Sequence, residues 1–291
     1  MLRLTNMKST LITIHYDREI QLNNLLRGLS LGTNVPDEVI VINMGQKPNI
    51  YKDYNLNLKI EQIEGDDRAR LPIGQSRNLG AKLASFETLH FLDVDCIPDK
   101  FYIEKMNDGL LNQNGLFMGT PKYLFDEVSE DFTFNELEKQ STEHHKRPSV
   151  KGIERSNDAG LFWSLCFSIS RSSFKKLGGF DEGYYGYGGE DTDLSFTCKK
   201  LNFPFFLTEA VAYHQQHGFY KPPVDKLQAI VDNCNYFYSK WNHWPMDKHL
   251  KAFAEYGYVD WEENQKKPIK VINKPDQFSI EQFYIKDIPY A

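Results

Sequence analysis

The feature that most constrains this chain is a regular alternation between short apolar runs and stretches with helical spacing. Four apolar runs, each short enough to be a buried strand, lie in the first hundred residues: Leu11–Ile14, Glu38–Ile42, Leu58–Ile63 and Thr88–Leu92. Between the first two runs, leucines recur at helical spacing at Leu22, Leu25, Leu26 and Leu29. Strands that alternate with helices predict an α/β fold, with a Rossmann-like, mostly parallel sheet flanked by helices. Ligands of such sheets collect beyond the carboxyl ends of the strands.

The middle of the chain continues this pattern after an interruption. Residues 125–157 are polar and charged, and we expect them to form a surface excursion or a mobile loop. The pattern then predicts strands at Leu165–Ser170 and Phe205–Tyr213, with a helix that starts near Glu190 between them.

The last part of the chain has a different pattern. Apolar side chains at helical spacing predict a mainly helical region until about Val259, followed by irregular structure after Lys266. No linker rich in Gly, Ser or Pro precedes it. We therefore expect a main domain at 1–218 and a helical C-terminal extension at 219–291 packed on it.

Composition excludes several classes of protein. The chain has 34 basic and 40 acidic residues, a net charge of -6, and no dense basic stretch, which disfavours nucleic-acid binding. Its apolar runs are too short for a signal peptide or a transmembrane helix, so we predict a cytoplasmic protein and leave peripheral membrane association open. The four cysteines form no CxxC pair and are expected to be buried free thiols.

The first acidic motif is Asp93-Val94-Asp95, directly after the run Thr88–Leu92. Side chains repeat every two residues in a strand, so the two carboxylates would share a face. Carboxylates that converge at a strand end are costly unless a cation lies between them, and a divalent cation that bridges a diphosphate meets this need. By itself this spacing is weak evidence for a metal site, because many such pairs are solvated loop acids or helix caps.

The second motif is the glycine-dense, acidic segment 178–193. Its six glycines permit positive φ angles and close approach of a bound ring to the backbone. Three interleaved aromatic residues, Tyr184, Tyr185 and Tyr187, are suited to stacking on sugar faces. The acids that end the segment stand where a helix begins, where carboxylates ordinarily act as helix caps, an interpretation that fits Asp193.

The two motifs together resemble those of the GT-A glycosyltransferases. Segment 91–98 is similar to the DVD segment of animal β-1,4-galactosyltransferases and bacterial family 2 enzymes, and segment 178–193 resembles the signature that those galactosyltransferases share with polypeptide GalNAc-transferases. The resemblance implies a GT-A fold, with Asp191 as the general base and Glu190 placed to hold the acceptor. Tyr187 departs from the galactosyltransferases, which have Trp there, so the acceptor geometry stays open.

The same resemblance implies a metal site. A histidine by itself is more often a core or surface residue than a ligand, but His214 matches the place where GT-A enzymes commonly complete the coordination of the cation. The implied ligands are Asp95 and His214, with His217 as the reserve choice, and the implied cation is Mn2+ or Mg2+.

The resemblance also implies a donor site. It places a UDP-sugar against residues of both halves of the domain: His15, Tyr16, Asp17, Asn43, Arg77, Asp93 and Gly189. Asn43 stands where family 2 enzymes often carry an acid that bonds uracil, and an amide can still pair with a base edge. Arg77 is expected to reach a phosphate, although an arginine on a solvated helix end is the simpler interpretation, and Asp93 to contact the ribose or the metal shell.

The implied function is inverting transfer of galactose or N-acetylgalactosamine from a UDP-sugar to a hydroxyl of a glycan or glycoconjugate. A catalytically silent sugar-nucleotide or glycan-binding module is the alternative, but it should have lost part of the Glu190–Asp191 pair. A nucleotidyltransferase should carry a glycine-rich, basic loop after the first strand, and His15–Arg18 lacks the glycines. Trp241 and Trp244 either cover the acceptor site or pack helices on the core.

Overall fold

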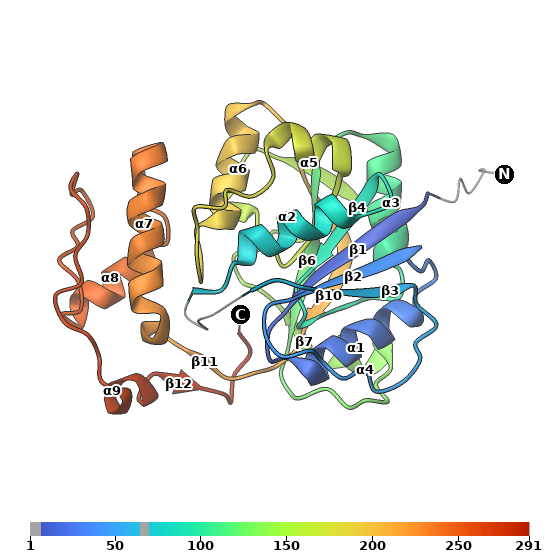
Figure 1. Cartoon of the computed structure of the whole chain (residues 1–291), viewed down its shortest axis with the longest axis horizontal. Helices are drawn as coiled ribbons and strands as arrows, with labels where there is room; N and C mark the ends of the chain where they lie inside the picture. The colour runs from blue at the N-terminus through green and yellow to red at the C-terminus, as the bar shows by residue number, and fades with distance from the viewer. Residues whose placement is uncertain (1–6, 65–69, 291) are drawn as a thin grey trace.

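The protein is organised around one large mixed sheet. The computed structural model describes residues 7–64 and 70–290. Eight strands form the main path of the sheet (Figure 1), in the order β3 (Leu58–Gln62), β2 (Glu38–Asn43), β1 (Ser9–His15), β4 (Thr88–Leu92), β9 (Cys166–Ser170), β6 (Leu116–Leu124), β10 (Phe205–His214) and β5 (Cys96–Pro98).

The amino-terminal half of the sheet has the architecture that the sequence predicts. β1 pairs in parallel with both β2 and β4, and β2 pairs in parallel with β3. Every residue of β1, β2 and β4 is buried. Helices α1 (Glu19–Ser30) and α2 (Ile73–Leu83) lie on opposite faces of this half in Figure 1. A strand that is covered on both faces has to be apolar along its whole length, which explains the continuous runs.

The carboxyl-terminal half makes the sheet mixed. β9 runs antiparallel to its neighbours β4 and β6, whereas β10 is parallel to β6. β5 is antiparallel to β10, with His214 opposite Cys96. α3 (Tyr102–Asn112), α5 (Arg171–Leu177) and α6 (Glu190–Lys200) join these strands. The pairing of β5 with β10 therefore brings the end of the first acidic motif to the histidines.

The polar region 125–157 is more ordered than expected. It contains α4 (Phe134–Lys139), β7 (Ser141–Glu143) and β8 (Ile153–Ser156), and the two strands pair with β6 and β10. Most of its residues are exposed, as expected of a surface excursion, but α4, β7 and β8 give it regular structure that was not predicted from the sequence. A capping box at the start of α4, in which Thr133 and Glu136 bond each other reciprocally, is the local signal that could have revealed this helix.

The C-terminal extension forms a separate apolar cluster beside the sheet. Its elements are β11 (Phe219–Tyr220), α7 (Leu227–Trp241), α8 (Asp247–Glu255), α9 (Gln277–Glu281) and β12 (Tyr284–Ile285). Residues of α7 and α8 form much of this cluster, together with Trp244, whose ring stacks on Tyr238 at 4.1 Å. Trp241 Nε1 donates to Asp193 of α6 at 2.7 Å, so both tryptophans pack helices. The domain boundary at residue 218 stays a prediction.

Two further expectations from composition can be compared with the structure. Cys96, Cys166, Cys198 and Cys234 are all buried free thiols, which confirms the prediction. No helix in the described part of the chain is both long and apolar enough to span a membrane.

Candidate active site

The first cluster of the site is formed where β5 pairs with the end of β10. Asp95 precedes β5, and its carbonyl oxygen accepts a hydrogen bond from the backbone N–H of Gln215 at 2.7 Å. This bond and the strand pairing position His214 and His217 beside the Asp95 carboxylate. His214 Nε2 lies 3.7 Å from Asp95 Oδ1, and His217 Nε2 lies 3.4 Å from Asp95 Oδ2.

These three side chains fit a divalent cation. One ligand atom from each lies within 4.8 Å of the other two, and this is the one such cluster found among residues 7–64 and 70–290. His217 Nδ1 donates to the carbonyl oxygen of Gly218 at 2.9 Å, which leaves the lone pair of Nε2 facing Asp95. Two imidazole nitrogens and a carboxylate are a donor set that manganese-like cations accept.

The electrostatics of the cluster suit a cation as well. Burial lowers the pKa of His214 to about 4, although the Asp95 carboxylate opposes this, so its imidazole is neutral at neutral pH. Burial would raise the pKa of Asp95, but His214, His217 and Arg18 outweigh it and hold the pKa below its usual range. The cluster therefore presents one anionic and at least one neutral ligand.

Arg77 joins the two acidic motifs. It extends from α2, is 4% exposed, and donates through Nη2 to Asp93 Oδ1 at 2.7 Å and through Nη1 to Glu190 Oε1 at 3.1 Å. Its guanidinium also lies over the ring of Phe180, 5.2 Å from the centroid. Both terminal nitrogens are thus committed to carboxylates, which does not support the expected contact with a phosphate. Nor is Arg77 on a solvated helix end.

The second acidic pair begins α6. Gly189 precedes it with a φ of 98°, a conformation that favours glycine, and a Cβ there would lie 3.0 Å from the ring of Tyr184. Glu190 is 7% exposed, and within the described part of the chain its Oε2 has no hydrogen-bond partner. Burial and the Asp191 carboxylate raise the pKa of Glu190 to about 7, against the opposing effect of Arg77.

Asp191 is half-buried at the same helix end. Its Oδ1 accepts hydrogen bonds from the backbone N–H of Thr192 at 2.6 Å and from the Thr192 hydroxyl at 3.2 Å. Burial raises the pKa of Asp191, although these bonds and Arg77 oppose the shift. A carboxylate with a raised pKa is a stronger base than one in water.

The aromatic residues of the glycine-rich segment have different environments. Tyr184 is 2% exposed and its hydroxyl donates to Asp193 Oδ1 at 3.0 Å, so the expectation that it stacks on a sugar is wrong. Tyr185 is exposed, and the hydroxyl of Tyr187 lies 3.0 Å from that of Tyr290. Asp193 is more than a helix cap, because it also accepts from Trp241 and pairs with Lys240.

Two residues that were expected to contact the donor, His15 and Asn43, are instead hydrogen-bonded to each other. His15 and Asn43 are buried, and His15 Nδ1 lies 2.7 Å from Asn43 Oδ1. Asn43 Nδ2 donates to the carbonyl of Gly45 and to Gln62 Oε1, at 2.8 and 2.7 Å. The expectation that Asn43 pairs with a base edge is therefore not supported, and the pair instead connects β1 to β2. Contacts of Tyr16 and Asp17 with a donor stay predictions.

Two residues near the site were not anticipated. Arg18 Nη1 lies 3.8 Å from Asp95 Oδ2, and the ring of Tyr290 stacks on His214 with centroids 5.4 Å apart. The position of Arg18 directly after the first predicted strand is a signal that could have indicated it. Tyr290 lies in a tail whose apolar residues show no regular spacing.

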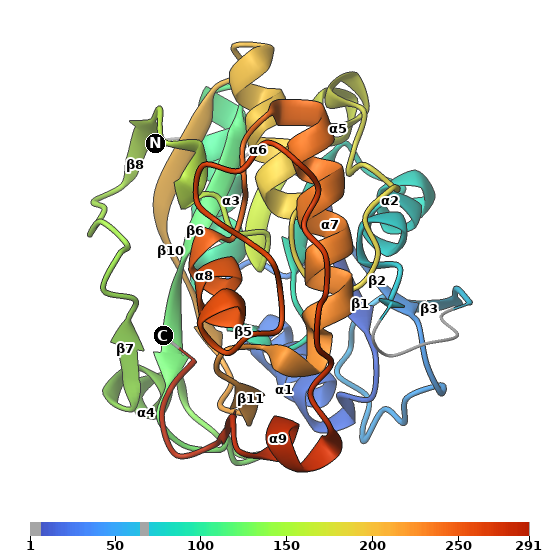
Figure 2. The ribbon, with the colours of Figure 1, turned by 90° about the vertical axis from the view of Figure 1, so that its left-hand side faces the viewer.

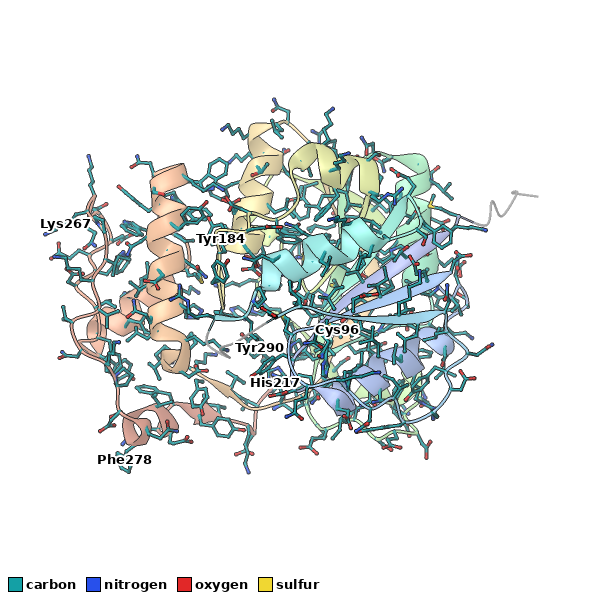
Figure 3. The ribbon with its side chains drawn as sticks, viewed as in Figure 1. Cys96, Tyr184, His217, Lys267, Phe278 and Tyr290 are labelled. Carbon is teal, nitrogen blue, oxygen red and sulfur yellow. The ribbon has the colours of Figure 1, made fainter. Side chains whose placement is uncertain are left out.

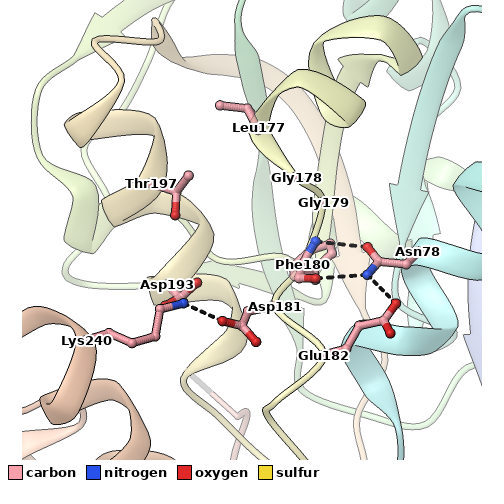
Figure 4. A pocket seen from close by; sticks show the side chains of 10 residues that line it. All are labelled: Asn78, Leu177, Gly178, Gly179, Phe180, Asp181, Glu182, Asp193, Thr197 and Lys240. Carbon is pink, nitrogen blue, oxygen red and sulfur yellow. Dashed lines mark hydrogen bonds and ion pairs between the residues drawn. The ribbon is translucent and has the colours of Figure 1, made fainter.

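The glycine-rich segment also borders a polar hollow of about 380 Å³ that is lined by residues of α2, α6 and α7 (Figure 4). Lys240 of α7 pairs with Asp181 and Asp193 there, and Asn78 bonds both backbone polar groups of Phe180 at 2.9 Å. Lys240 is therefore paired with both aspartates, and Glu182 accepts a hydrogen bond from Asn78. The acids Glu190 and Asp191 do not line it, so we interpret it as a junction between α2, α6 and α7.

Comparison with known sequences identifies similar proteins. Residues 151–211, which include the whole glycine-rich segment, match a family described as the N-terminal domain of galactosyltransferase. A chondroitin synthase of Pasteurella multocida (strain Pm70) is 23% identical over 244 residues, which is 72% of this chain and 25% of that protein. A validoxylamine A glucosyltransferase of Streptomyces hygroscopicus subsp. limoneus is 25% identical over 251 residues, 77% of this chain and 55% of that protein. The chain thus spans between a quarter and about half of these relatives.

Solved structures show a similar fold. Residues 1–349 of S. aureus TarS align with a TM-score of 0.52 and 17% identity, covering 78% of this chain and 64% of that one. GalNAc-T7, solved with UDP, GalNAc and Mn2+, aligns with a TM-score of 0.55 and 13% identity, covering 86% of this chain and 54% of that one.

Proposed function

Since the chain has the GT-A glycosyltransferase fold with a galactosyltransferase-like segment, as its motifs predicted, we propose that it transfers a sugar from a nucleotide-sugar to an acceptor hydroxyl. The relatives support an enzyme that transfers hexoses. The observation that carries the proposal is the double ion pair of Arg77 with Asp93 and Glu190. It joins the metal-ligand motif to the acid pair, so that both border one site.

We assign the donor side of the reaction to the cluster at the end of β10. Asp95, His214 and His217 would hold Mn2+ or Mg2+ beside the diphosphate. When bound, such a cation stabilises the negative charge of a departing nucleoside diphosphate. Arg18, which lies beside Asp95, adds positive charge on the same side. Asp93, with one oxygen held by Arg77, is oriented toward the ribose or the metal shell.

We assign the acceptor side to the start of α6. Asp191 takes the proton of the acceptor hydroxyl as the acceptor oxygen attacks the anomeric carbon, and the bond from that carbon to the phosphate oxygen breaks. Attack on the face opposite the leaving group inverts the configuration. Glu190 holds the acceptor through Oε2, while Arg77 holds Oε1.

The identity of the donor rests on similarity. The segment that resembles the galactosyltransferase and GalNAc-transferase signature favours UDP-galactose or UDP-N-acetylgalactosamine, and the fold neighbour GalNAc-T7 was solved with UDP and Mn2+. The relatives, a chondroitin synthase and a glucosyltransferase, are named for different activities. The choice of sugar therefore rests on the galactosyltransferase-like segment. We propose a glycan or glycoconjugate acceptor and a cytoplasmic location.

Titration of UDP tests this function. The protein should bind UDP in the presence of Mn2+, lose that binding in EDTA and regain it when excess Mn2+ is added. A panel of nucleotide-sugars with Mn2+ then identifies the donor, because a ligand at one hundred times its dissociation constant stabilises the fold by roughly 2.7 kcal/mol. UDP binding that is unchanged in EDTA would contradict the metal site. Binding of a nucleotide-sugar without transfer to any acceptor would support a silent binding module instead.

A further inference from the structure

The tail of the chain returns to the candidate metal cluster. After α9, β12 pairs with β11 through Phe219 opposite Ile285 and Tyr220 opposite Tyr284. The next residues pass along the segment that carries the histidines, where Gln216 Nε2 donates to the carbonyl oxygens of Lys286 and Ile288 at 2.7 and 2.8 Å. Figure 2 shows this path from α9 past β11 to the C-terminus. We name residues 283–290 the strap.

Tyr290 ends the strap directly against the cluster. Its ring stacks on His214 at 5.4 Å and 21° between planes, and lies 5.8 Å from the ring of His217. Figure 3 shows Tyr290 beside His217. Its hydroxyl lies 3.0 Å from the hydroxyl of Tyr187, which belongs to the glycine-rich segment. One side chain thus contacts both halves of the proposed site.

This position conflicts with a bound donor. The Asp95–His214–His217 cluster supplies only three protein ligands, so a cation held there needs further oxygens, which a diphosphate would supply. Those oxygens have to approach on a side of the cluster that the strap does not cover. Tyr290 contacts both imidazoles and also Tyr187, so its ring occupies space between the metal cluster and the glycine-rich segment that a donor in the proposed site would need.

The strap is held weakly enough to leave. No residue from 270 to 290, all of which the structure describes, is buried. Within the strap, regular structure is limited to the two-residue strand β12, and most side chains are exposed. Segments with few buried apolar contacts and exposed backbone hydrogen bonds open at a small fraction of the global unfolding free energy.

We propose that the strap is an autoinhibitory element, with Tyr290 as its latch, which covers the metal cluster in the free protein and is displaced when the donor diphosphate binds. The inference rests on the proposed donor site. A site that is competent only when the strap is open binds its ligand more weakly, in proportion to the open fraction. If about one molecule in ten is open, removal of the latch strengthens donor binding about tenfold.

Calorimetric titration of UDP with Mn2+ tests this on three variants. Deletion of residues 286–291 and Tyr290→Ala should each lower the dissociation constant about five- to tenfold. Phe278→Ala is the matched control, since Phe278 is 75% exposed on α9 of the same extension, and its binding should be unchanged. Circular dichroism establishes that each variant is folded. If both latch variants bind UDP as tightly as the parent chain or more weakly, the strap is not autoinhibitory.

Hydrogen exchange of the intact chain gives a second, independent readout. Addition of UDP and Mn2+ should increase exchange of the backbone amides in peptides covering residues 283–290, because the strap leaves. A lid that closes over bound donor would instead lower this exchange, and that result would refute the proposal. If neither the full chain nor the deletion variant binds UDP or any other nucleoside diphosphate, the proposed function itself fails. If the full chain and the deletion variant bind UDP equally well, only the autoinhibitory role of the strap is refuted.

Discussion

Asp93 and Asp95 follow a strand, whereas Glu190 and Asp191 begin a helix, yet one acid of each pair binds Arg77. The remaining acids have opposite surroundings. Asp95 faces two histidines and Arg18, which lower its pKa, while burial raises the pKa of Asp191. In the proposed function, this difference suits Asp95 to act as an anionic metal ligand and Asp191 to act as a base. Burial acts in the same direction on both carboxylates, so what differs is the charge of their neighbours.

The largest expected effect separates the two pairs by function. Asp191→Asn should lower turnover roughly 10²–10⁴-fold and leave UDP binding with Mn2+ nearly intact, because only the proton acceptor is lost. Single-turnover transfer rates and UDP titration measure the two quantities. Glu182→Gln, at an exposed acid of the same segment, is the control and should keep its rate. A near-normal rate in Asp191→Asn would exclude Asp191 as the base.

The next largest effect concerns Arg77, which binds one acid of each pair. Arg77→Met leaves the carboxylates of Asp93 and Glu190 without their buried cation, which should destabilise the fold by roughly 3–5 kcal/mol. Urea unfolding measures the loss. The control Arg155→Gln changes an exposed arginine and should cost less than about 0.5 kcal/mol. If Arg77→Met is as stable as the parent, then Arg77 does not couple the two pairs.

A smaller effect tests the first pair alone. Asp95→Asn removes the anionic ligand of the cluster, so UDP binding that depends on Mn2+ should weaken at least about tenfold, since even changes behind a metal ligand cost roughly 10–100-fold in affinity. Asp99→Asn, in the loop directly after β5, is the matched control. Titration with and without Mn2+ measures both. Equal Mn2+ dependence in Asp95→Asn and in the parent chain would remove Asp95 from the metal site.

The sequence predicted the parts of this comparison that depend on local pattern. Continuous apolar runs predicted the buried strands β1, β2 and β4, whereas β3, also predicted as a buried strand, is half-exposed at the sheet edge. The two acidic motifs predicted the carboxylates of the candidate site. The resemblance also placed Asp95, His214 and His217 in one cluster, and they do lie together. A family motif fixes residue types at chain positions that the fold brings together, so it carries this information across long separations.

The sequence did not predict the tertiary contacts that several residues of the candidate site make. Arg77 was interpreted as an arginine at a helix start, but it lies in the middle of α2, buried between Asp93 after β4 and Glu190 of α6. His15 and Asn43 were expected to face a donor, but the register of β1 with β2 places them opposite each other. Tyr290 lies in a tail without periodicity, so its contact with His214 follows from tertiary structure alone.

The smallest effect is a pH dependence of stability that arises from the second pair. The pKa of Glu190 is raised to about 7 in the folded chain, above its ordinary value of 4.5. The folded state keeps a proton that the unfolded chain has lost between these values. The stability that this proton contributes is therefore complete below about pH 4.5 and is lost as the pH rises through about 7.

Glu190→Gln removes this titration. Relative to the parent chain, the variant should gain unfolding free energy between pH 5 and pH 8, by roughly 2 kcal/mol, because each unit of pKa shift corresponds to about 1.4 kcal/mol. Urea unfolding at both pH values measures the difference, and Glu182→Gln, whose side chain is exposed, should follow the parent at both. Parallel stabilities of Glu190→Gln and the parent across this range would mean that Arg77 keeps Glu190 ionised at neutral pH. The two acidic pairs would then differ in position but not in charge.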